Sequence, residues 1–540
     1  MTLPLLDISN VSVSFGQVRV LKNISFSIAP GEIVGFAGES GSGKSTICRA
    51  ALGLLSSNGT VSGDIRLDGR SLTGLDAVAW SALRGRDLSM IFQNPSSHLN
   101  PLQPIGRQIA QPMIRHLGLS RAEAWQKAVA LLDDVGIREP AMRARSYPHE
   151  LSGGMKQRVM IAAAVGCGPR LLVADEPTTA LDVTVQQKIL ELLKDLNHKR
   201  DLAIALISHD LGVLADICSR IVVMRHGEIV EEGPAAQVVS DPRHPYTRLL
   251  INSQPGRKAL TSGWSGEVAD APLLEVKDLK VHFPVKRDIV DMLQRRVREP
   301  FRALDGIDLT IRAGETVGIV GESGSGKSTL ARAIILQNRP TAGSVSLEGQ
   351  PTDTLSGAAL LAFRRRVQMV FQNPYDSLNP RMTALESIAE PIWRHQLADR
   401  AGAFKEAERL LDMVELKRDL GSRRPGQLSG GQCQRVGIAR ALALKPGILI
   451  ADEITSALDV TTQAQVLDLL ARLQRERKLA LLYISHDLAV VGSFCQRVYV
   501  FRSGKVVEHD AAAKVLGNPR EAYTRQLVAS IHRLPEPVAG

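Results

Sequence analysis

The chain has 540 residues, of which 44% are hydrophobic, 23% are charged and 4% are aromatic. One hydrophobic core does not usually serve a chain of this length, so we expect about two to four domains. The ordinary balance of hydrophobic and charged residues excludes a disordered or fibrous protein. The net charge of +10 is scattered, without a long basic block, which indicates solubility and a bias towards anionic membrane surfaces rather than a nucleic-acid partner.

The five cysteines show neither a Cys-x-x-Cys motif nor a Cys/His spacing typical of metal ligands. The sequence therefore predicts a reducing compartment, without a disulfide framework or a zinc site. The N-terminus lacks the basic and apolar regions of a signal peptide, and no run of about 18 apolar residues occurs. We expect a protein that is neither secreted nor membrane-spanning, so any work at a membrane requires a partner that spans it.

The nine residues "GESGSGKST" occur twice, at 38–46 and at 321–329. Longer motifs also recur, and the pairs are "IFQNPSSHLNP" (91–101) with "VFQNPYDSLNP" (370–380), "LSGGMKQR" (151–158) with "LSGGQCQR" (428–435), and "LLVADEPTTALDVT" (171–184) with "ILIADEITSALDVT" (448–461). From the LSGG motif onwards the two copies stay 277 positions apart, from Ser152 to Ser429 and from Tyr246 to Tyr523. This constant offset predicts a duplicated domain.

The segment between the copies is rich in Gly, Ser, Pro and Ala and has no apolar periodicity, which is typical of a linker. We therefore predict a first domain with its tail at 1–251, a linker at 252–272 and a second domain with its tail at 273–540. The second copy carries 15 extra residues around "KRDIVDMLQRRVREP". The apolar spacing of Ile289, Leu293 and Val297 permits a short amphipathic helix near a membrane or partner, but an enlarged surface hairpin is the commoner structure.

Each copy alternates apolar β-type runs such as "EIVGFAG" with helical stretches, and each glycine-rich loop follows a strand and opens a helix. This order favours an α/β fold with a parallel sheet covered on both faces. The segments between "FQNP" and "LSGG" have helical periodicity, as in "RAEAWQKAVALLDDVG" and "RAGAFKEAERLLDMVE". We expect two α/β cores, each with an inserted helical subdomain.

The repeated nine residues fit the pattern G-x-x-x-x-G-K-[ST] of a phosphate-binding loop. Its glycines let backbone N–H groups turn towards phosphate oxygens, and the positive end of the following helix adds to the attraction. Lys44 and Lys327 are expected to reach the β- and γ-phosphates, and Ser45 and Ser328 to ligate Mg²⁺. The remaining predicted nucleotide-binding residues of the two loops are Gly38, Ser40, Gly41, Ser42, Gly43, Thr46, Gly321, Ser323, Gly324, Ser325, Gly326 and Thr329.

A pair of carboxylates ends an apolar strand in each copy, at a fixed distance after the phosphate loop. Asp175 and Asp452 are expected to hold Mg²⁺ through water, and Glu176 and Glu453 to orient or deprotonate the attacking water. The other candidates are the "SHDL" histidines as γ-phosphate sensors and two glutamines that contact metal and water, namely His209, His486, Gln93 and Gln372.

With "LSGG" placed before these glutamates, nearly the whole chain resembles the ATP-binding cassette (ABC) ATPases. In that family the signature residues complete the ATP site of the opposite cassette, so that two cassettes sandwich two ATP molecules. The resemblance implies that Ser429, Gly430 and Gly431 serve the first loop, and that Ser152, Gly153 and Gly154 serve the second. It also implies that two early aromatics, Phe15 and Phe283, stack on adenine.

Both predicted sites keep every catalytic residue, so the resemblance implies two hydrolytic sites. One departure is Ile454, where the family usually has a proline, as at Pro177. Because proline restricts φ, its loss predicts a less rigid loop at the second site.

Finer motifs, such as "HPYTRLL" and its echo "EAYTRQL", resemble the ATPases of dipeptide and oligopeptide importers, a group that includes glutathione and nickel systems. The resemblance implies an ATPase with fused cassettes, at the cytoplasmic face of the inner membrane, that needs no second copy. Its partners would be two transmembrane permease subunits and a periplasmic or lipid-anchored binding protein. Some relatives carry an iron–sulfur cluster in the first tail, but residues 240–275 contain no cysteine, so we expect none here.

Two other functions remain open from the sequence. A soluble tandem-cassette translation factor would share the two cassettes, but those proteins have a long charged helical linker. The tandem ATPase of a sugar importer would share the layout, but its second cassette is generally degraded. The transported molecule itself leaves no mark in an ATPase sequence.

Overall fold

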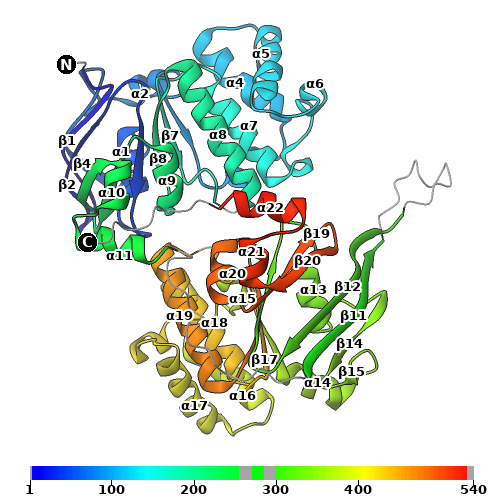
Figure 1. Ribbon diagram of the computed structural model, residues 1–540. Coiled ribbons are helices and arrows are strands. Elements are labelled where there is room, and N and C mark those ends of the chain that lie inside the picture. Colours follow the sequence, from blue (N-terminus) through cyan, green and yellow to red (C-terminus); the bar gives the residue numbers. More distant parts are fainter. Residues whose placement is uncertain (1–2, 180, 255–270, 285–298, 457, 532–540) are drawn as a thin grey trace. The chain divides into compact units, whose positions relative to one another are not determined.

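The computed structural model describes residues 3–179, 181–254, 271–284, 299–456 and 458–531 (Figure 1). Contacts divide the chain into unit 1, which includes Met1–Gln254, and unit 2, which is Pro255–Ile531. The segment predicted as a linker lies largely outside the described residues, and so does most of the insert in the second copy. Each unit is described by itself below.

Unit 1 contains a small antiparallel sheet and a larger central sheet. The small sheet has the order β2 (Val18–Ile28), β1 (Leu6–Phe15), β4 (Gly59–Leu67) and β5 (Arg70–Ser71). The central sheet has the order β10 (Glu228–Pro234), β9 (Arg220–Arg225), β3 (Ile33–Ala37), β8 (Ala203–Ile207), β7 (Leu171–Asp175) and β6 (Leu88–Ile91). Strands β9 to β6 in this order are parallel, and only β10 is antiparallel to its neighbour.

The central strands β3, β7 and β8 are buried at every residue, as expected for parallel strands covered on both faces. Successive residues of β8 belong to two different hydrophobic clusters, with Ala205 in one and Leu206 in the other. Each face of the sheet therefore has its own core. The helices outside the inserted subdomain are α1 (Lys44–Ala51), α2 (Ala77–Leu83), α3 (Pro95–His98), α8 (Val183–Arg200), α9 (Leu211–Ile217), α10 (Ala235–Ser240) and α11 (Pro245–Asn252).

The helical insertion predicted from sequence is present between β6 and β7. It comprises α4 (Ile105–Leu117), α5 (Arg121–Asp134), α6 (Pro140–Arg143), the 3₁₀ helix η1 (Pro148–Glu150) and α7 (Gly153–Val165). Helix α5 begins at a capping box, in which Ser120 and Glu123 satisfy each other's backbone N–H groups. Within unit 1, this helical region and the antiparallel sheet lie at opposite ends (Figure 1).

Unit 2 repeats this architecture. Its antiparallel sheet has the order β12 (Phe301–Arg312), β11 (Pro272–Phe283), β14 (Ala342–Leu347) and β15 (Gln350–Pro351). Its central sheet has the order β16 (Val367–Val370), β17 (Ile448–Asp452), β18 (Ala480–Ile484), β13 (Thr316–Val320), β19 (Arg497–Arg502) and β20 (Lys505–Ala511). The predicted α/β fold with an inserted helical subdomain is therefore confirmed in both copies.

The helices of unit 2 follow the same sequence of positions. They are α13 (Lys327–Ile334), α14 (Gly357–Arg366), α15 (Pro374–Ser377), α16 (Ala384–Arg394), α17 (Arg400–Met413), η2 (Arg418–Ser422), η3 (Pro425–Gln427), α18 (Gly430–Leu442), α19 (Val460–Arg477), α20 (Leu488–Phe494), α21 (Ala512–Gly517) and α22 (Ala522–Ala529). None of the helices in the described part of the chain combines the length and the apolar character that crossing a membrane requires.

The insert of the second copy joins two paired strands. Strand β11 runs antiparallel to β12, and Phe283 at the end of β11 lies opposite Phe301 at the start of β12. In unit 1 the matching strands turn within a few residues, because Phe15 lies opposite Val18. The extra residues thus extend a strand-to-strand connection, while the proposed amphipathic helix around Ile289, Leu293 and Val297 lies outside the described residues.

Candidate functional site

The two phosphate loops lie where the sequence placed them, between a buried central strand and a helix. In unit 1 the loop follows β3, and α1 begins at Lys44; in unit 2 it follows β13, and α13 begins at Lys327. Gly38 has a φ of 145°, and a Cβ atom there would lie 2.3 Å from the carbonyl oxygen of Met224. Only glycine fits this close approach to β9.

The loop lysines are buried and are held by the loop itself. The Nζ atom of Lys44 donates to the carbonyl oxygens of Gly38 at 2.7 Å and Glu39 at 2.8 Å. The Nζ atom of Lys327 donates to the carbonyl oxygens of Gly321 at 2.7 Å and Glu322 at 2.9 Å. Both ammonium groups are therefore fixed beside the backbone N–H groups of the loop, where anionic phosphates would be attracted.

The predicted metal ligands form close oxygen pairs. The hydroxyl of Ser45 donates to Oδ1 of Asp175 at 2.7 Å, and that of Ser328 donates to Oδ1 of Asp452 at 3.1 Å. Burial raises the pKa of both aspartates, although the serine hydrogen bonds and nearby cations oppose this shift. A hydroxyl and a carboxylate are hard oxygen donors, so this pair fits the coordination chemistry of Mg²⁺.

The catalytic candidate Glu176 has three side-chain partners. Gln93 donates from Nε2 to its carboxylate at 2.7 Å, the Thr179 hydroxyl donates at 2.9 Å, and Nδ1 of His209 lies 3.7 Å from Oε1. The φ of Glu176 is 47°, a left-handed conformation that is uncommon outside glycine and concentrates at functional sites. Its backbone N–H donates to Ile207 at the end of β8, which fixes this turn to the neighbouring strand.

Glu453 has the same left-handed φ of 47° and a similar set of contacts. Gln372 donates to its carboxylate at 2.8 Å, and Nδ1 of His486 lies 3.7 Å from Oε2. The third contact differs, because the hydroxyl of Ser456 donates to the backbone carbonyl of Glu453 and not to its carboxylate. Among the described residues, the Glu453 carboxylate thus has no counterpart of the hydroxyl bond that Thr179 supplies to Glu176.

The glutamates and histidines shift each other's protonation. Burial opposes ionisation of Glu176 and Glu453, but the facing histidine, 3.7 Å away, together with the loop lysine, outweighs it and lowers the pKa of each glutamate. Burial also opposes protonation of His209 and His486, but the facing glutamate outweighs it and raises the pKa of each histidine. Each pair is therefore biased towards a carboxylate facing an imidazolium.

The LSGG segments begin the long helices of the inserted subdomains. Ser152 is the N-cap of α7, and Ser429 is the N-cap of α18; each hydroxyl accepts a backbone N–H of its own helix, at 3.4 Å and 3.3 Å. Both serines are exposed. Within the described part of the chain, neither these segments nor the two predicted adenine-stacking aromatics supply a hydrogen bond to the glutamates predicted to be catalytic.

The two signature glycines of each unit differ in what surrounds them. A Cβ atom at Gly154 would lie 2.5 Å from Val185, and one at Gly431 would lie 2.4 Å from Thr462, so these glycines are required by packing within their own unit. A Cβ atom at Gly153 would meet only Leu181, at an ordinary 3.6 Å. The corresponding glycine of unit 2, Gly430, is equally open, with its nearest contact at 3.6 Å.

The predicted adenine-stacking residues end matching strands but differ in exposure. Phe15 at the end of β1 is partly buried against the hydrophobic cluster of unit 1. Phe283 at the end of β11 is 40% exposed. The first ring is thus packed in the protein, whereas the second presents a large apolar surface to solvent.

One ion pair in unit 1 and two kinds of contact that occur in both units were not predicted from the sequence. Arg49 lies 3.7 Å from Asp175. The N–H of Gly227 donates to the Ser42 carbonyl at 3.0 Å, and in unit 2 Gly504 makes the same bond to the loop at 2.9 Å. The tail tyrosines contact the loops through their hydroxyls. Only the constant offset of these residues in the repeat could have drawn attention to them.

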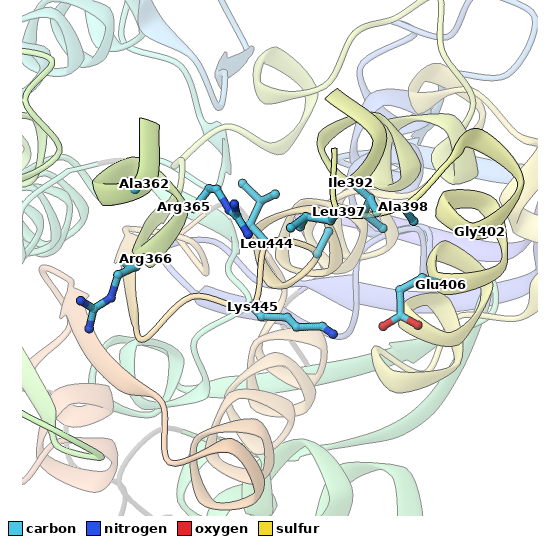
Figure 2. Close-up of a pocket in the computed structure, with 11 residues that line it drawn as sticks. Ala362, Arg365, Arg366, Ile392, Leu397, Ala398, Gly402, Glu406, Leu444 and Lys445 are labelled. Atoms are coloured by element: carbon cyan, nitrogen blue, oxygen red, sulfur yellow. The ribbon is translucent and has the colours of Figure 1, made fainter. Parts of the chain in front are cut away.

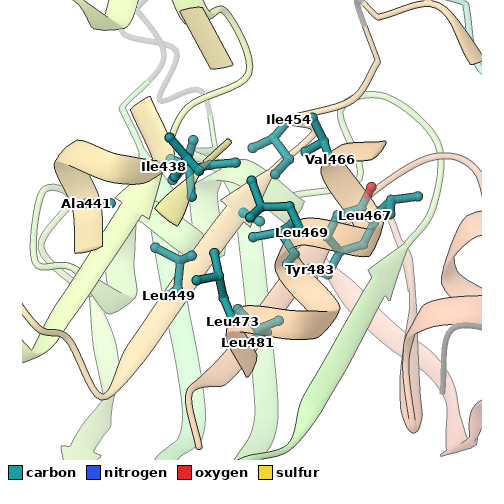
Figure 3. Close-up of a cluster of buried hydrophobic side chains, with 14 of the residues drawn as sticks. Ile438, Ala441, Leu449, Ile454, Val466, Leu467, Leu469, Leu473, Leu481 and Tyr483 are labelled. Atoms are coloured by element: carbon teal, nitrogen blue, oxygen red, sulfur yellow. The ribbon is translucent and has the colours of Figure 1, made fainter. Parts of the chain in front are cut away.

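Ile454, the departure from the expected proline, is a core residue. Its side chain is 1% exposed and lies in a hydrophobic cluster beside Val466 and Tyr483 (Figure 3). The following residue, Thr455, is hydrogen-bonded through its hydroxyl to the hydroxyl of Tyr483 at 2.9 Å. The loop after the second glutamate is therefore fastened to β18, where unit 1 has a proline in the loop and Leu206 on the strand.

Comparison with known families gives two matches. Residues 21–179 and 304–456 match the family described as ABC transporter. Residues 230–272 match the C-terminal region of oligopeptide/dipeptide transporters. The first match covers more than half of the chain and falls once in each unit.

Three curated relatives align over nearly the whole chain. The "Peptidoglycan transport ATP-binding protein YejF" of Agrobacterium fabrum is 46% identical, over 98% of this chain and 96% of its own. The "Uncharacterized ABC transporter ATP-binding protein YejF" of Escherichia coli K12 is 43% identical, over 98% of this chain and all of its own. The "Glutathione import ATP-binding protein GsiA" of the same strain is 40% identical, over 97% of this chain and 89% of its own.

Proposed function

The chain belongs to the ABC transporter family, and we propose that it powers the import of peptides across the inner membrane. As a family member it is an ATP-binding subunit with two cassettes, and it hydrolyses ATP to drive transport. The observation that carries the choice of peptide is the match of residues 230–272 to the oligopeptide/dipeptide transporter tail. The relatives' names include both peptidoglycan transport and glutathione import, which are compatible with peptide-like substrates.

For hydrolysis, Lys44 would hold the phosphates, and Ser45 with Asp175 would hold Mg²⁺, which neutralises phosphate charge when bound. Glu176 would accept the proton of the attacking water as its oxygen attacks the γ-phosphorus and ADP leaves. Its low pKa keeps it as a carboxylate, and Gln93 and the imidazolium of His209 orient it. Lys327, Ser328, Asp452, Glu453, Gln372 and His486 would take the same roles in the second cassette.

We propose further that each site is completed by the signature residues of the other cassette. Ser429, Gly430 and Gly431 would contact the nucleotide held by Lys44. Ser152, Gly153 and Gly154 would contact the nucleotide held by Lys327. The support is the exposed N-terminus of a 13-residue helix, which attracts anions, and the open space at the first signature glycine. Neither feature is explained by packing within one unit.

Pairs of substitutions test this arrangement through steady-state ATPase activity. Ser429→Arg and Lys44→Ala would disable the same site, so combining them should cost no more than either alone. Ser429→Arg combined with Lys327→Ala would disable both sites and should abolish turnover. If each cassette used its own signature segment, the two results would be exchanged.

The proposed membrane partners are two permease subunits, each inserting a cytoplasmic helix into a groove beside Gln93 or Gln372. Unit 2 has a cavity of about 520 Å³ at this position, and Phe371, immediately before Gln372, lines it. Glu390 and Arg394 of α16 add charged groups to an apolar wall, which suits an amphipathic helix. A permease helix that displaces residues of this groove would also shift Gln372, and with it the hydrogen bond from Gln372 to Glu453.

A second cavity, of about 590 Å³, adjoins the first and shares Leu444 with it. Figure 2 shows its lining, in which Lys445 extends towards Glu406 and Arg365 lies farther from that carboxylate. The first cavity is tested with Arg394→Glu, which reverses the charge of one of its lining residues. This variant should release the permease in co-purification but leave basal ATPase activity unchanged. Arg365→Glu in the neighbouring cavity is the matched control; equal loss in both variants would point to a general charge effect.

The proposed substrate is tested with the assembled transporter. Uptake of labelled dipeptides, longer peptides, glutathione and nickel should be measured in cells that lack the chain and in cells that carry it again. Restored uptake of peptides supports the proposal, whereas restored uptake of glutathione or nickel alone would assign the chain to those importers. Co-purification with ribosomes instead of permeases would favour the translation factor. The periplasmic or lipid-anchored binding protein and the peripheral position at the inner membrane are part of the same proposal.

A further inference from the structure

Each tail carries one tyrosine whose hydroxyl touches the phosphate loop. Tyr246, near the start of α11, is 2% exposed, and its hydroxyl accepts the backbone N–H of Glu39 at 2.9 Å. Tyr523, near the start of α22, is 6% exposed, and its hydroxyl accepts the backbone N–H of Glu322 at 3.1 Å. The contact spans more than 200 residues in each unit, so it is a tertiary contact and not a feature of local folding.

The hydrogen bond acts on the peptide that holds the phosphate-binding lysine. Glu39 donates its N–H to Tyr246, while the carbonyl oxygens of Gly38 and Glu39 accept from Nζ of Lys44. The peptide between Gly38 and Glu39 is therefore held at both its polar atoms, by the tyrosine and by the lysine. Rotation of this peptide would break both bonds and displace the ammonium group.

The ring itself is held by a cation. The guanidinium carbon of Arg225 lies 4.7 Å from the centre of the Tyr246 ring, and that of Arg502 lies 4.8 Å from the centre of the Tyr523 ring. Arg225 is the last residue of β9, and Arg502 is the last residue of β19. The turn after each of these strands donates a glycine N–H to the phosphate loop, and in unit 1 this glycine is Gly227. The tail and this turn therefore support the same loop from two directions.

The segment before each tyrosine is held by a glutamate on the last strand of its unit. Glu231 of β10 accepts the backbone N–H groups of Arg243 and His244 at 2.8 Å and 3.0 Å. Glu508 of β20 accepts two successive backbone N–H groups in the same way, at 2.9 Å and 3.1 Å. The second unit keeps this anchor although a glutamate replaces the histidine there.

We propose that Tyr246 and Tyr523 are positioning residues for ATP, which hold the phosphate loop and its lysine in the geometry that receives the phosphates. The tail is thereby a structural part of each ATP site. Four contacts occur in both units, although the tail sequences around the tyrosines differ. They are the tyrosine hydroxyl bond, the arginine over the tyrosine ring, the glycine N–H bond to the loop and the glutamate that binds two backbone N–H groups. This inference rests on ATP hydrolysis by the family and not on the identity of the transported molecule.

The test is the change of tyrosine to phenylalanine, which removes the hydroxyl and keeps the ring. Because the loop binds phosphate in both the ground state and the transition state, Tyr246→Phe together with Tyr523→Phe should raise KM for ATP by about 2- to 12-fold, the effect of one net hydrogen bond. The kcat should stay within about twofold of wild type. Exchange of backbone amides in residues 38–46 should become faster in the same variant.

The matched control is Tyr499→Phe. Tyr499 is 3% exposed, and its hydroxyl accepts the backbone N–H of Thr310 on β12 and a guanidinium N–H of Arg497, both at 3.3 Å. This control loses a comparable buried hydroxyl bond and should leave KM unchanged. The proposal is overturned if the double variant keeps the wild-type KM and loop exchange, or if Tyr499→Phe raises KM equally. A failure of peptide uptake would leave these measurements unaffected.

Discussion

The hydrogen bond between Tyr483 and Thr455 offers a sharp test of how the second cassette holds the loop after its glutamate. Tyr483 is fully buried, Thr455 is 4% exposed, and their hydroxyls lie 2.9 Å apart. Tyr483→Phe keeps the ring, its edge-on contact with Phe494 and nearly all of its volume. The change leaves the buried Thr455 hydroxyl without this partner, at the residue that follows Ile454 in the loop.

The cost follows from burial. A buried polar group that loses its hydrogen-bond partner destabilises a protein by about 1–3 kcal/mol. This corresponds to a rise of about 5- to 150-fold in the opening equilibrium of the second unit. Thr455→Val alone should also destabilise the unit, because it leaves the buried hydroxyl of Tyr483 without its Thr455 partner. The double variant should cost less than the sum of the two, because neither hydroxyl is then left behind.

Hydrogen–deuterium exchange resolved by peptide is the appropriate assay, because the two units need not unfold together. Peptides from β17 and β18 should lose protection in Tyr483→Phe. Peptides from β7 and β8 of unit 1 serve as the internal control, since Leu206 occupies the matching position there. Unchanged protection in Tyr483→Phe, or a double variant as unstable as the sum of the singles, would refute the reasoning.

The remaining predictions concern the proposed ATP sites. Glu176→Gln and Glu453→Gln should each remove at least about half of the steady-state ATPase activity, because general-base catalysis contributes about 10²- to 10⁴-fold at a site; wild-type turnover in either variant would contradict two hydrolytic sites. Gly153→Ala should lower ATPase activity without changing thermal stability, whereas Gly154→Ala should lower both, because only the second Cβ atom clashes within unit 1; a matching loss of stability in Gly153→Ala would assign that glycine to packing. The raised pKa of His209 makes its pairing with the glutamate stabilising at pH 6, and this stability is lost as the pH rises through the folded-state pKa. The difference in melting temperature between wild type and His209→Asn should therefore shrink from pH 6 to pH 9, and a constant difference would argue against the ion pair.

Several features of the site were readable without a structure because they depend on short-range chemistry. Gly38 and Lys44 belong to one continuous motif, and the strand-to-helix turn around it follows from local apolar patterns. Glu176 ends an apolar strand, and in a parallel sheet the carboxyl ends of neighbouring strands meet at one edge. The approach of Gln93 and His209 to Glu176 follows from the same rule, since each comes after a parallel strand of the central sheet.

Other features depend on residues that are distant in the chain. Ile454 was expected to loosen its loop, because a missing proline removes a local restraint. The structure adds a restraint that no local pattern contains, since Thr455 reaches Tyr483 on the neighbouring strand. The tail tyrosines show the same difference: the repeat marked Tyr246 and Tyr523 as equivalent, but only their folded positions show that both hydroxyls end at the phosphate loop.

The sequence alone determined the duplication, the α/β class and the residue types expected to bind phosphate, because these depend on adjacent residues and on periodicity. The tertiary structure decided which hydroxyls, guanidinium groups and glycines support those residues. A hydrogen bond such as that between Tyr246 and Glu39 requires two atoms within about 3 Å, and only the folded chain brings a helix of the tail to the loop after β3.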